Sequence, residues 1–129
     1  MPDTTTIIAI DFDGTVVGHA FPDVGRDAPH CVEVLKRITD RGIKIILWTM
    51  RSSIYLVDAE QWYADKGIPL FGINNNPEQG SWSNSPKAYA HIYIDDAALG
   101  CPVKFDEETQ RSIVDWVEVE KILELRGVI

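Results

Sequence analysis

Short apolar runs without polar alternation recur along the first three quarters of the chain. They cover residues 6–10, 43–48 and 91–94, and a weaker run covers 69–73, where Pro69 fits only at the start of a strand. Runs of this length are typical of strands that are buried on both faces of a parallel sheet. We therefore expect four strands in one parallel sheet.

Apolar residues recur with the spacing of one helix face in three further stretches. The three stripes are Val32, Leu35 and Ile38, then Leu56, Ala59 and Tyr63, and last Ile113, Trp116, Val119 and Leu123. Each stretch ends in a basic residue followed by glycine, at Arg41-Gly42, Lys66-Gly67 and Arg126-Gly127. The cation suits the negative end of the helix dipole and the glycine suits a left-handed cap. We therefore expect a helix in each stretch.

Strands that alternate with helices form βαβ units, whose crossovers are right-handed. The expected fold is therefore α/β, with a doubly wound, Rossmann-like and mostly parallel sheet. Residues 1–129 are enough for one domain with its own core. Ligands of such sheets bind in the crevice at the carboxyl ends of the strands. Functional side chains are therefore expected directly after the predicted strands.

Carboxylates and a hydroxyl follow the first two predicted strands. Asp11 and Asp13 lie in the sequence Asp-Phe-Asp-Gly-Thr at 11–15, and Thr49 follows the run at 43–48. If the strand geometry continues through residue 13, the two aspartates share a face and converge above the sheet. Two like charges so close together need a cation or a proton. This edge of the sheet is therefore a candidate site.

The last predicted strand is followed by two adjacent carboxylates, Asp95 and Asp96, which suit a divalent metal ion. Shortly before that strand lies Ser85-Pro86-Lys87. A serine N-cap and a proline in the first turn predict a short helix that places the Lys87 ammonium at its positive end. Such a helix would favour an anion. The pattern thus predicts a metal site and an anion site on one edge of the sheet.

These residues resemble the four motifs of the haloacid dehalogenase superfamily. Asp-Phe-Asp-Gly-Thr at 11–15 matches the first motif, Thr49 the second, Lys87 the third, and Asp95 with Asp96 the fourth. The match in order, spacing and strand-end placement covers about residues 6–100 and is far more specific than one short motif. The chain looks most similar to the small members of the superfamily that lack a large cap domain.

The resemblance implies a magnesium-dependent phosphatase that hydrolyses phosphomonoesters through an aspartyl phosphate on Asp11. Asp13 would act as general acid and base, because phosphatases and mutases of the superfamily carry an aspartate there. Thr49 and Lys87 would stabilise the phosphoryl group. Mg²⁺ would be held by the Asp11 carboxylate, the main-chain carbonyl of Asp13, and Asp95, Asp96 or both. The short intervals between the motifs argue against a mutase, which would need an enclosed site.

Charge counting gives a first expectation for Asp13. The four carboxylates of the motifs exceed the combined charge of Mg²⁺ and Lys87 by one negative charge. Protonation of Asp13 would remove that excess and leave the group in the form that a general acid needs.

Three further residues are candidates for contact with the substrate. Arg51 either contacts the substrate phosphate or lies on the surface, and both interpretations stay open. Phe21 lies in the segment 16–26, whose glycines, aromatic and cations suit a flap over the site, although the segment could be a simple connector. Trp82 lies in the long polar loop 74–85, where length favours ligand contact or disorder.

Composition limits the classes of partner that the protein is expected to bind. The net charge of −8 and the absence of a basic cluster argue against nucleic acid, and no apolar run has the length of a membrane span. The first six residues lack a signal-peptide pattern, which predicts a cytoplasmic protein. The expected partner is a phosphorylated substrate, most simply a small molecule.

Two rival functions belong to different classes. A receiver domain of response regulators also combines an acidic pocket, a phosphorylated aspartate, a hydroxyl and a lysine, but its phosphoacceptor follows the third strand, where this chain has Asn74. A non-catalytic binding module could hold a metal ion or ligand in the same acidic crevice. Steady release of phosphate from a model ester would distinguish an enzyme from both.

Overall fold

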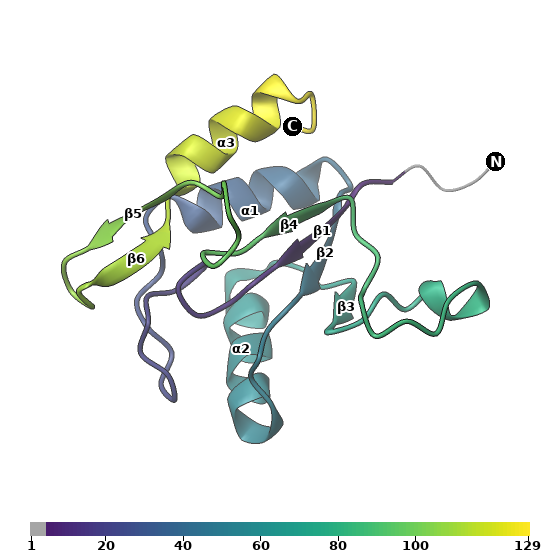
Figure 1. Cartoon of the computed structure of the whole chain (residues 1–129), viewed down its shortest axis with the longest axis horizontal. Coiled ribbons are helices and arrows are strands. Elements are labelled where there is room, and N and C mark those ends of the chain that lie inside the picture. Colours follow the sequence, from purple (N-terminus) through teal and green to yellow (C-terminus); the bar gives the residue numbers. More distant parts are fainter. Residues whose placement is uncertain (1–4) are drawn as a thin grey trace.

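The computed structural model describes residues 5–129 and contains the four predicted parallel strands. These are β1 (Ile7–Ile10), β2 (Lys44–Leu47), β3 (Gly72–Ile73) and β4 (Ile92–Ile94), in the spatial order β3-β2-β1-β4 (Figure 1). Residues 1–4, part of the stretch behind the cytoplasmic prediction, lie outside the described residues. The strand order reverses at β1, as in doubly wound sheets, whereas helices cover only one face of this sheet.

Two helices follow the predicted stripes closely. α1 (Cys31–Asp40) connects β1 to β2, and α2 (Ser53–Lys66) connects β2 to β3. α2 ends at Gly67, which takes the left-handed conformation with φ of 71°. The helix-end signal of a basic residue before glycine is thus confirmed. None of the helices described between residues 5 and 129 is long and apolar enough to cross a membrane.

The C-terminal prediction was wrong at its start. The expected third helix began at Ile113, but this residue belongs to an antiparallel hairpin of β5 (Val103–Asp106) and β6 (Arg111–Val114). The last helix, α3 (Trp116–Leu125), begins after Asp115, whose carboxylate caps it by accepting from the Glu118 N–H. One buried strand residue before the cap, Ile113, had been included in the helical stripe, because a short apolar run fits both periods.

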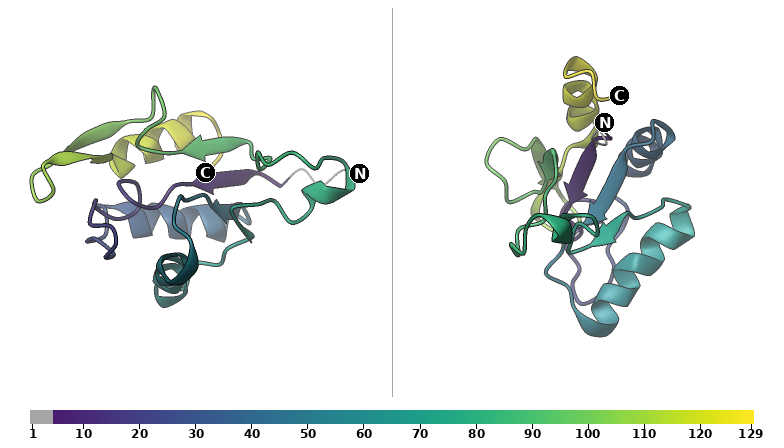
Figure 2. Two further views of the ribbon diagram at one scale, coloured as in Figure 1. Left: turned by 60° about the horizontal axis from the view of Figure 1, so that its bottom comes forward. Right: turned by 90° about the vertical axis from the view of Figure 1, so that its right-hand side faces the viewer.

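The helices gather on one face of the sheet (Figure 2). The buried residues of α1, α2 and α3 form one core cluster with the side chains of Ile8 and Ile10. The opposite face, with Ile7 and Ala9, packs against Ala88 from the connection between β3 and β4. That connection holds only one short 3₁₀ turn, η1 (Gln79–Ser81). No cap domain is inserted anywhere in residues 5–129.

Candidate metal centre and active site

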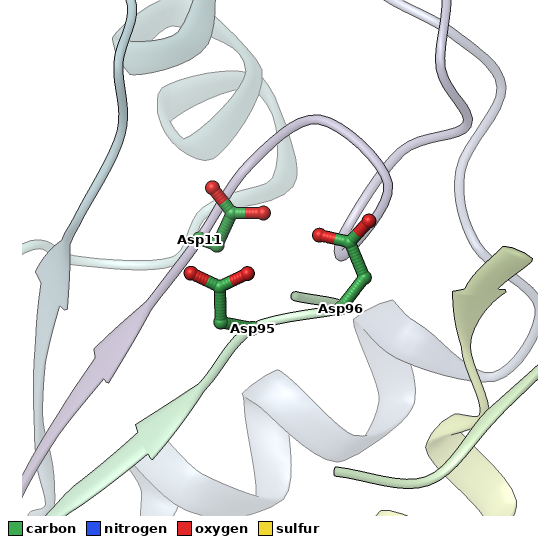
Figure 3. Close-up of side chains that lie close together, drawn as sticks. All are labelled: Asp11, Asp95 and Asp96. Carbon is green, nitrogen blue, oxygen red and sulfur yellow. The ribbon is translucent and has the colours of Figure 1, made fainter. Parts of the chain in front are cut away.

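Three carboxylates meet at the carboxyl ends of the two central strands. Asp11 follows β1, and Asp95 and Asp96 follow β4, so one ligand oxygen from each lies within 4.8 Å of the others. Figure 3 shows the three carboxylates pointing toward one another. The N–H of Asp11 donates to the carbonyl of Ile94 at 2.9 Å, which joins the two strand ends. The predicted convergence of the first and fourth motifs is therefore present.

The electrostatics of this cluster favour a cation. Burial, and to a smaller extent the charge of Asp95, raise the pKa of Asp11 from 3.8 to about 7, while a hydrogen bond from Thr15 opposes the shift. The ionised cluster is therefore unfavourable by itself. An all-oxygen set of three carboxylates suits a hard divalent cation such as Mg²⁺ and provides no soft sulfur or imidazole ligand. The residues present thus fit the predicted metal ion.

Thr15 is a buried residue that binds two members of the carboxylate cluster. It was not among the candidate site residues predicted from the sequence. Its hydroxyl donates to Asp11 Oδ2 at 2.8 Å and accepts from the N–H of Asp96 at 3.2 Å. One hydroxyl thereby fixes two of the three carboxylate residues. Thr15 could have been identified from its position as the last residue of the 11–15 motif. A polar side chain there is more easily explained by a hydrogen bond in the site than by apolar packing.

Gly14 allows the motif to pass close to the cluster. It has a φ of 81°, and a Cβ at this position would lie 2.1 Å from His19 Nε2 and 2.6 Å from Asp96 Oδ2. His19 Nε2 itself lies 3.1 Å from Asp96 Oδ2. The glycine is therefore required both for its backbone conformation and for the space that His19 and Asp96 occupy.

β6 and α3 hold the backbone of the 11–15 motif through two hydrogen bonds. The N–H of Val114, the last residue of β6, donates to the carbonyl of Gly14 at 3.1 Å. The indole N–H of buried Trp116, the first residue of α3, donates to the carbonyl of Thr15 at 2.7 Å. The hairpin and α3 thus fix the backbone of the loop that carries the candidate nucleophile.

Asp13 lies outside the carboxylate cluster and pairs with Arg51. The guanidinium donates to both Asp13 carboxylate oxygens at 2.8 Å, and the arginine is only 3% exposed. The surface interpretation of Arg51 was therefore wrong. The charge count also changes, because Arg51 balances one carboxylate. Charge neutrality of the motifs with Mg²⁺ and Lys87 no longer requires a protonated Asp13.

Thr49 occupies the carboxyl end of β2, as predicted. Its N–H donates to Asn74 Oδ1 at 2.8 Å, and its hydroxyl accepts from the N–H of Arg51 at 3.1 Å. These contacts link the ends of β2 and β3. In this contact the Thr49 hydroxyl is the acceptor, so its own proton is free to be donated to another group.

Lys87 differs from its prediction. The chain forms no helix at Ser85–Lys87; instead the N–H of Lys87 donates to Ser85 Oγ at 3.2 Å in a turn. The ammonium lies 5.6 Å from the ring centroid of Tyr93 in β4. No ion pair in residues 5–129 joins Lys87 to the three clustered carboxylates. The helix prediction was wrong because the Gln79 side chain binds the Ser85 and Lys87 carbonyls and the Tyr89 N–H, which a helix would have paired with one another or with later residues.

The two candidate aromatic residues lie in different places. The Phe21 ring lies 5.2 Å from the Arg51 guanidinium, which brings the segment 16–26 to the site. Trp82 packs on Tyr89, which in turn contacts His91. Figure 1 shows the neighbouring η1 turn projecting away from the arrowheads of β1 and β4.

The contacts of the His91 imidazole show at which end of the sheet Trp82, Tyr89 and His91 lie. His91 Nδ1 accepts from the N–H of Ile7, the first residue of β1. Trp82 is therefore connected to the amino ends of the strands and is not brought together with the acidic cluster.

The loop 74–85 is ordered by two buried amides. Gln79 donates to the carbonyls of Ser85 and Lys87 and accepts from the N–H of Tyr89, and Asn76 donates to the carbonyl of Tyr89. Disorder, one of the two alternatives for this loop, is therefore wrong. Only its first residue, Asn74, contacts the strand-end residues of the site.

Fold and site together define a small α/β protein with a four-stranded parallel sheet and an acidic cluster that could hold a metal ion. No protein-family model and no curated protein matches the sequence. Among solved structures, the chain is similar to a conserved protein coded by a locus of Bacteroides thetaiotaomicron. The identity is 30%, the match covers 95% of this chain and 93% of that chain, and the TM-score is 0.78. The chain belongs to the same family as this conserved protein.

Proposed function

We propose that this protein is a magnesium-dependent phosphomonoester hydrolase of the haloacid dehalogenase superfamily, with Asp11 as the nucleophile. The main support is the convergence of Asp11, Asp95 and Asp96 at the carboxyl ends of β1 and β4. Each of these residues belongs to a motif that resembles the superfamily. The topology and the missing cap agree with its small cap-less members.

In the proposed reaction, a carboxylate oxygen of Asp11 attacks phosphorus and the bond between phosphorus and the ester oxygen breaks. Asp13 gives a proton to the departing oxygen. A water molecule then attacks the phosphorus of the aspartyl phosphate and gives a proton to Asp13, while the bond between phosphorus and the Asp11 oxygen breaks. Inorganic phosphate leaves, and Asp11 is restored.

The surroundings of Asp11, Asp13 and Thr49 support their proposed roles. Thr15 orients Asp11 through a hydrogen bond of 2.8 Å, and Arg51 orients Asp13 through two. Each carboxylate oxygen has a further lone pair, so a proton can bind Asp13 while Arg51 stays in place. Thr49 provides a hydroxyl at the same edge. The role of Lys87 as a cation for the phosphoryl oxygens rests on its match to the third motif.

Mg²⁺ would be held by the carboxylates of Asp11, Asp95 and Asp96 and the main-chain carbonyl of Asp13. When bound, it supplies positive charge that lets a phosphate dianion approach an acidic cluster. The substrate in this proposal is a phosphorylated small molecule that enters beside the loop containing Phe21. A receiver function is disfavoured because β3 is followed by Asn74 and carries no carboxylate there.

The proposal is tested by phosphate release from a panel of phosphorylated metabolites with Mg²⁺. Wild-type protein should turn over many equivalents, and Asp11→Asn should lose at least about a hundredfold in rate. Asp58→Asn, an exposed position in α2, is the matched control and should retain full activity. A single equivalent of phosphate retained on the protein would indicate a receiver, and metal binding without any turnover would indicate a binding module. Either result would overturn the proposal.

A further inference from the structure

Every N–H of the Arg51 guanidinium has an acceptor. Two donate to Asp13, through Nε and Nη2, at 2.8 Å each. The others donate to the backbone carbonyls of Asp23 at 2.7 Å, Tyr55 at 3.2 Å and Pro22 at 3.4 Å. An arginine has five such donors, so none is left for a substrate phosphate in this arrangement.

The packing around this side chain is equally complete. The guanidinium carbon lies 5.1 Å from the ring centroid of Phe12 and 5.2 Å from that of Phe21. The Arg51 side chain is 1% exposed. A buried charge is tolerated only when its hydrogen bonds are satisfied, so these contacts form one interdependent unit.

Arg51 follows β2, and its contacts connect two parts of the segment that follows β1. One part is Asp13, in the first motif. The other is the loop 18–26, which is closed at its base by the Gly18 N–H donating to the Arg26 carbonyl at 2.8 Å. At its tip, the carbonyls of Pro22 and Asp23 both accept from Arg51.

We propose that Arg51 is a positioning residue that holds the Asp13 carboxylate and the tip of the loop 18–26 in one arrangement. This inference rests on the proposed function for its catalytic consequence. Because both Asp13 oxygens are bound in a plane, the carboxylate has one orientation toward the departing oxygen. The same guanidinium fixes Phe21 beside it, so proton transfer and the position of the loop depend on one side chain.

A lysine cannot replace this function. Its ammonium has three donors and no planar fork, so it cannot bind both Asp13 oxygens and three carbonyls together. Arg51→Lys keeps the charge and tests geometry, whereas Arg51→Met removes the charge and keeps much of the apolar stem. Arg37, which pairs with Glu120 on the surface, is the matched control position for both substitutions.

The first test uses the leaving group. p-Nitrophenolate departs readily without a proton, whereas an alkoxide needs one from Asp13. Arg51→Lys should therefore lose roughly tenfold more in kcat on an alkyl phosphate than on p-nitrophenyl phosphate, with a smaller change in KM. The stabilisation by Mg²⁺ should persist, because Arg51 contacts none of the three clustered carboxylates. Equal losses on both esters would overturn the positioning role.

The second test does not depend on activity. Arg26 is already exposed but is held in the closed loop. Release of Pro22 and Asp23 should make this segment mobile enough for trypsin to cleave after Arg26, which mass spectrometry identifies from the fragment ends. Arg51→Met and Arg51→Lys should be cut there several times faster than wild type and Arg37→Met, at equal helix content by circular dichroism. Unchanged cleavage in a folded Arg51 variant would overturn the proposal. Wild-type protein without phosphatase activity would instead refute the proposed function and leave this result standing.

Discussion

Replacement of Asp11 by asparagine should make the metal-free protein more stable while it abolishes turnover. Asparagine has the shape of a protonated aspartate: its oxygen can still accept from the Thr15 hydroxyl, and its amide can donate to Asp96. The substitution removes the ionised form whose burial beside Asp95 is unfavourable. Asp58→Asn, which changes the same charge on the surface of α2, is the control.

The size of the expected stabilisation follows from the shift in the pKa of Asp11 on folding. Folding raises the pKa of Asp11 from 3.8 to about 7, a shift of about 3 units at about 1.4 kcal/mol each, which sets an upper bound of about 4 kcal/mol. Partial exposure and solvent screening reduce this to about 1–2 kcal/mol. The favourable contribution of protonated Asp11 is complete below about pH 4 and is lost as the pH rises through 7. The gain from asparagine should therefore be larger at pH 8 than at pH 5.

Differential scanning calorimetry in excess chelator provides the assay. A gain of about 1–2 kcal/mol at pH 8 corresponds to a rise of roughly 3–10 °C in Tm for a protein of this size. Mg²⁺ should raise the Tm of wild type much more than that of Asp11→Asn. The reasoning is refuted if metal-free Asp11→Asn is no more stable than wild type at pH 8, or if Asp58→Asn gains equally.

Three further outcomes are expected. Mg²⁺ should be obligatory for turnover. Its affinity, measured by calorimetry, should increase as the pH rises through 7, because Mg²⁺ displaces the proton of Asp11. Ca²⁺ should bind but support little turnover, since its larger coordination shell is looser. Thr15→Val should lower the free energy of unfolding by about 1–3 kcal/mol in chemical denaturation and weaken Mg²⁺ binding, whereas Thr39→Val in α1 should do neither. Phe21→Ala should lower kcat/KM for the preferred substrate and spare p-nitrophenyl phosphate, while Trp82→Ala should affect neither ester; equal losses on both esters would indicate structural damage.

Much of the architecture was accessible from local patterns. The four parallel strands and the ends of α1 and α2 leave short-range signals, since apolar runs and a basic residue before glycine act within a few residues. The meeting of Asp11 with Asp95 and Asp96 followed as well. Parallel strands end at one edge of a sheet, so carboxylates placed directly after β1 and β4 must become neighbours there.

The remaining features depend on pairings between distant residues. Arg51 contacts Asp13 across 38 positions, and Trp116 contacts Thr15 across 101. No sequence periodicity or motif relates Arg51 to Asp13, or Trp116 to Thr15. Which donor meets which acceptor is decided by how the loop 18–26, the hairpin and α3 pack around the first motif. The sequence by itself determined the sheet and the acidic edge, because those follow from strand direction. Only the tertiary structure decided how Asp11 and Asp13 are held, because buried polar groups must find partners wherever the packing places them.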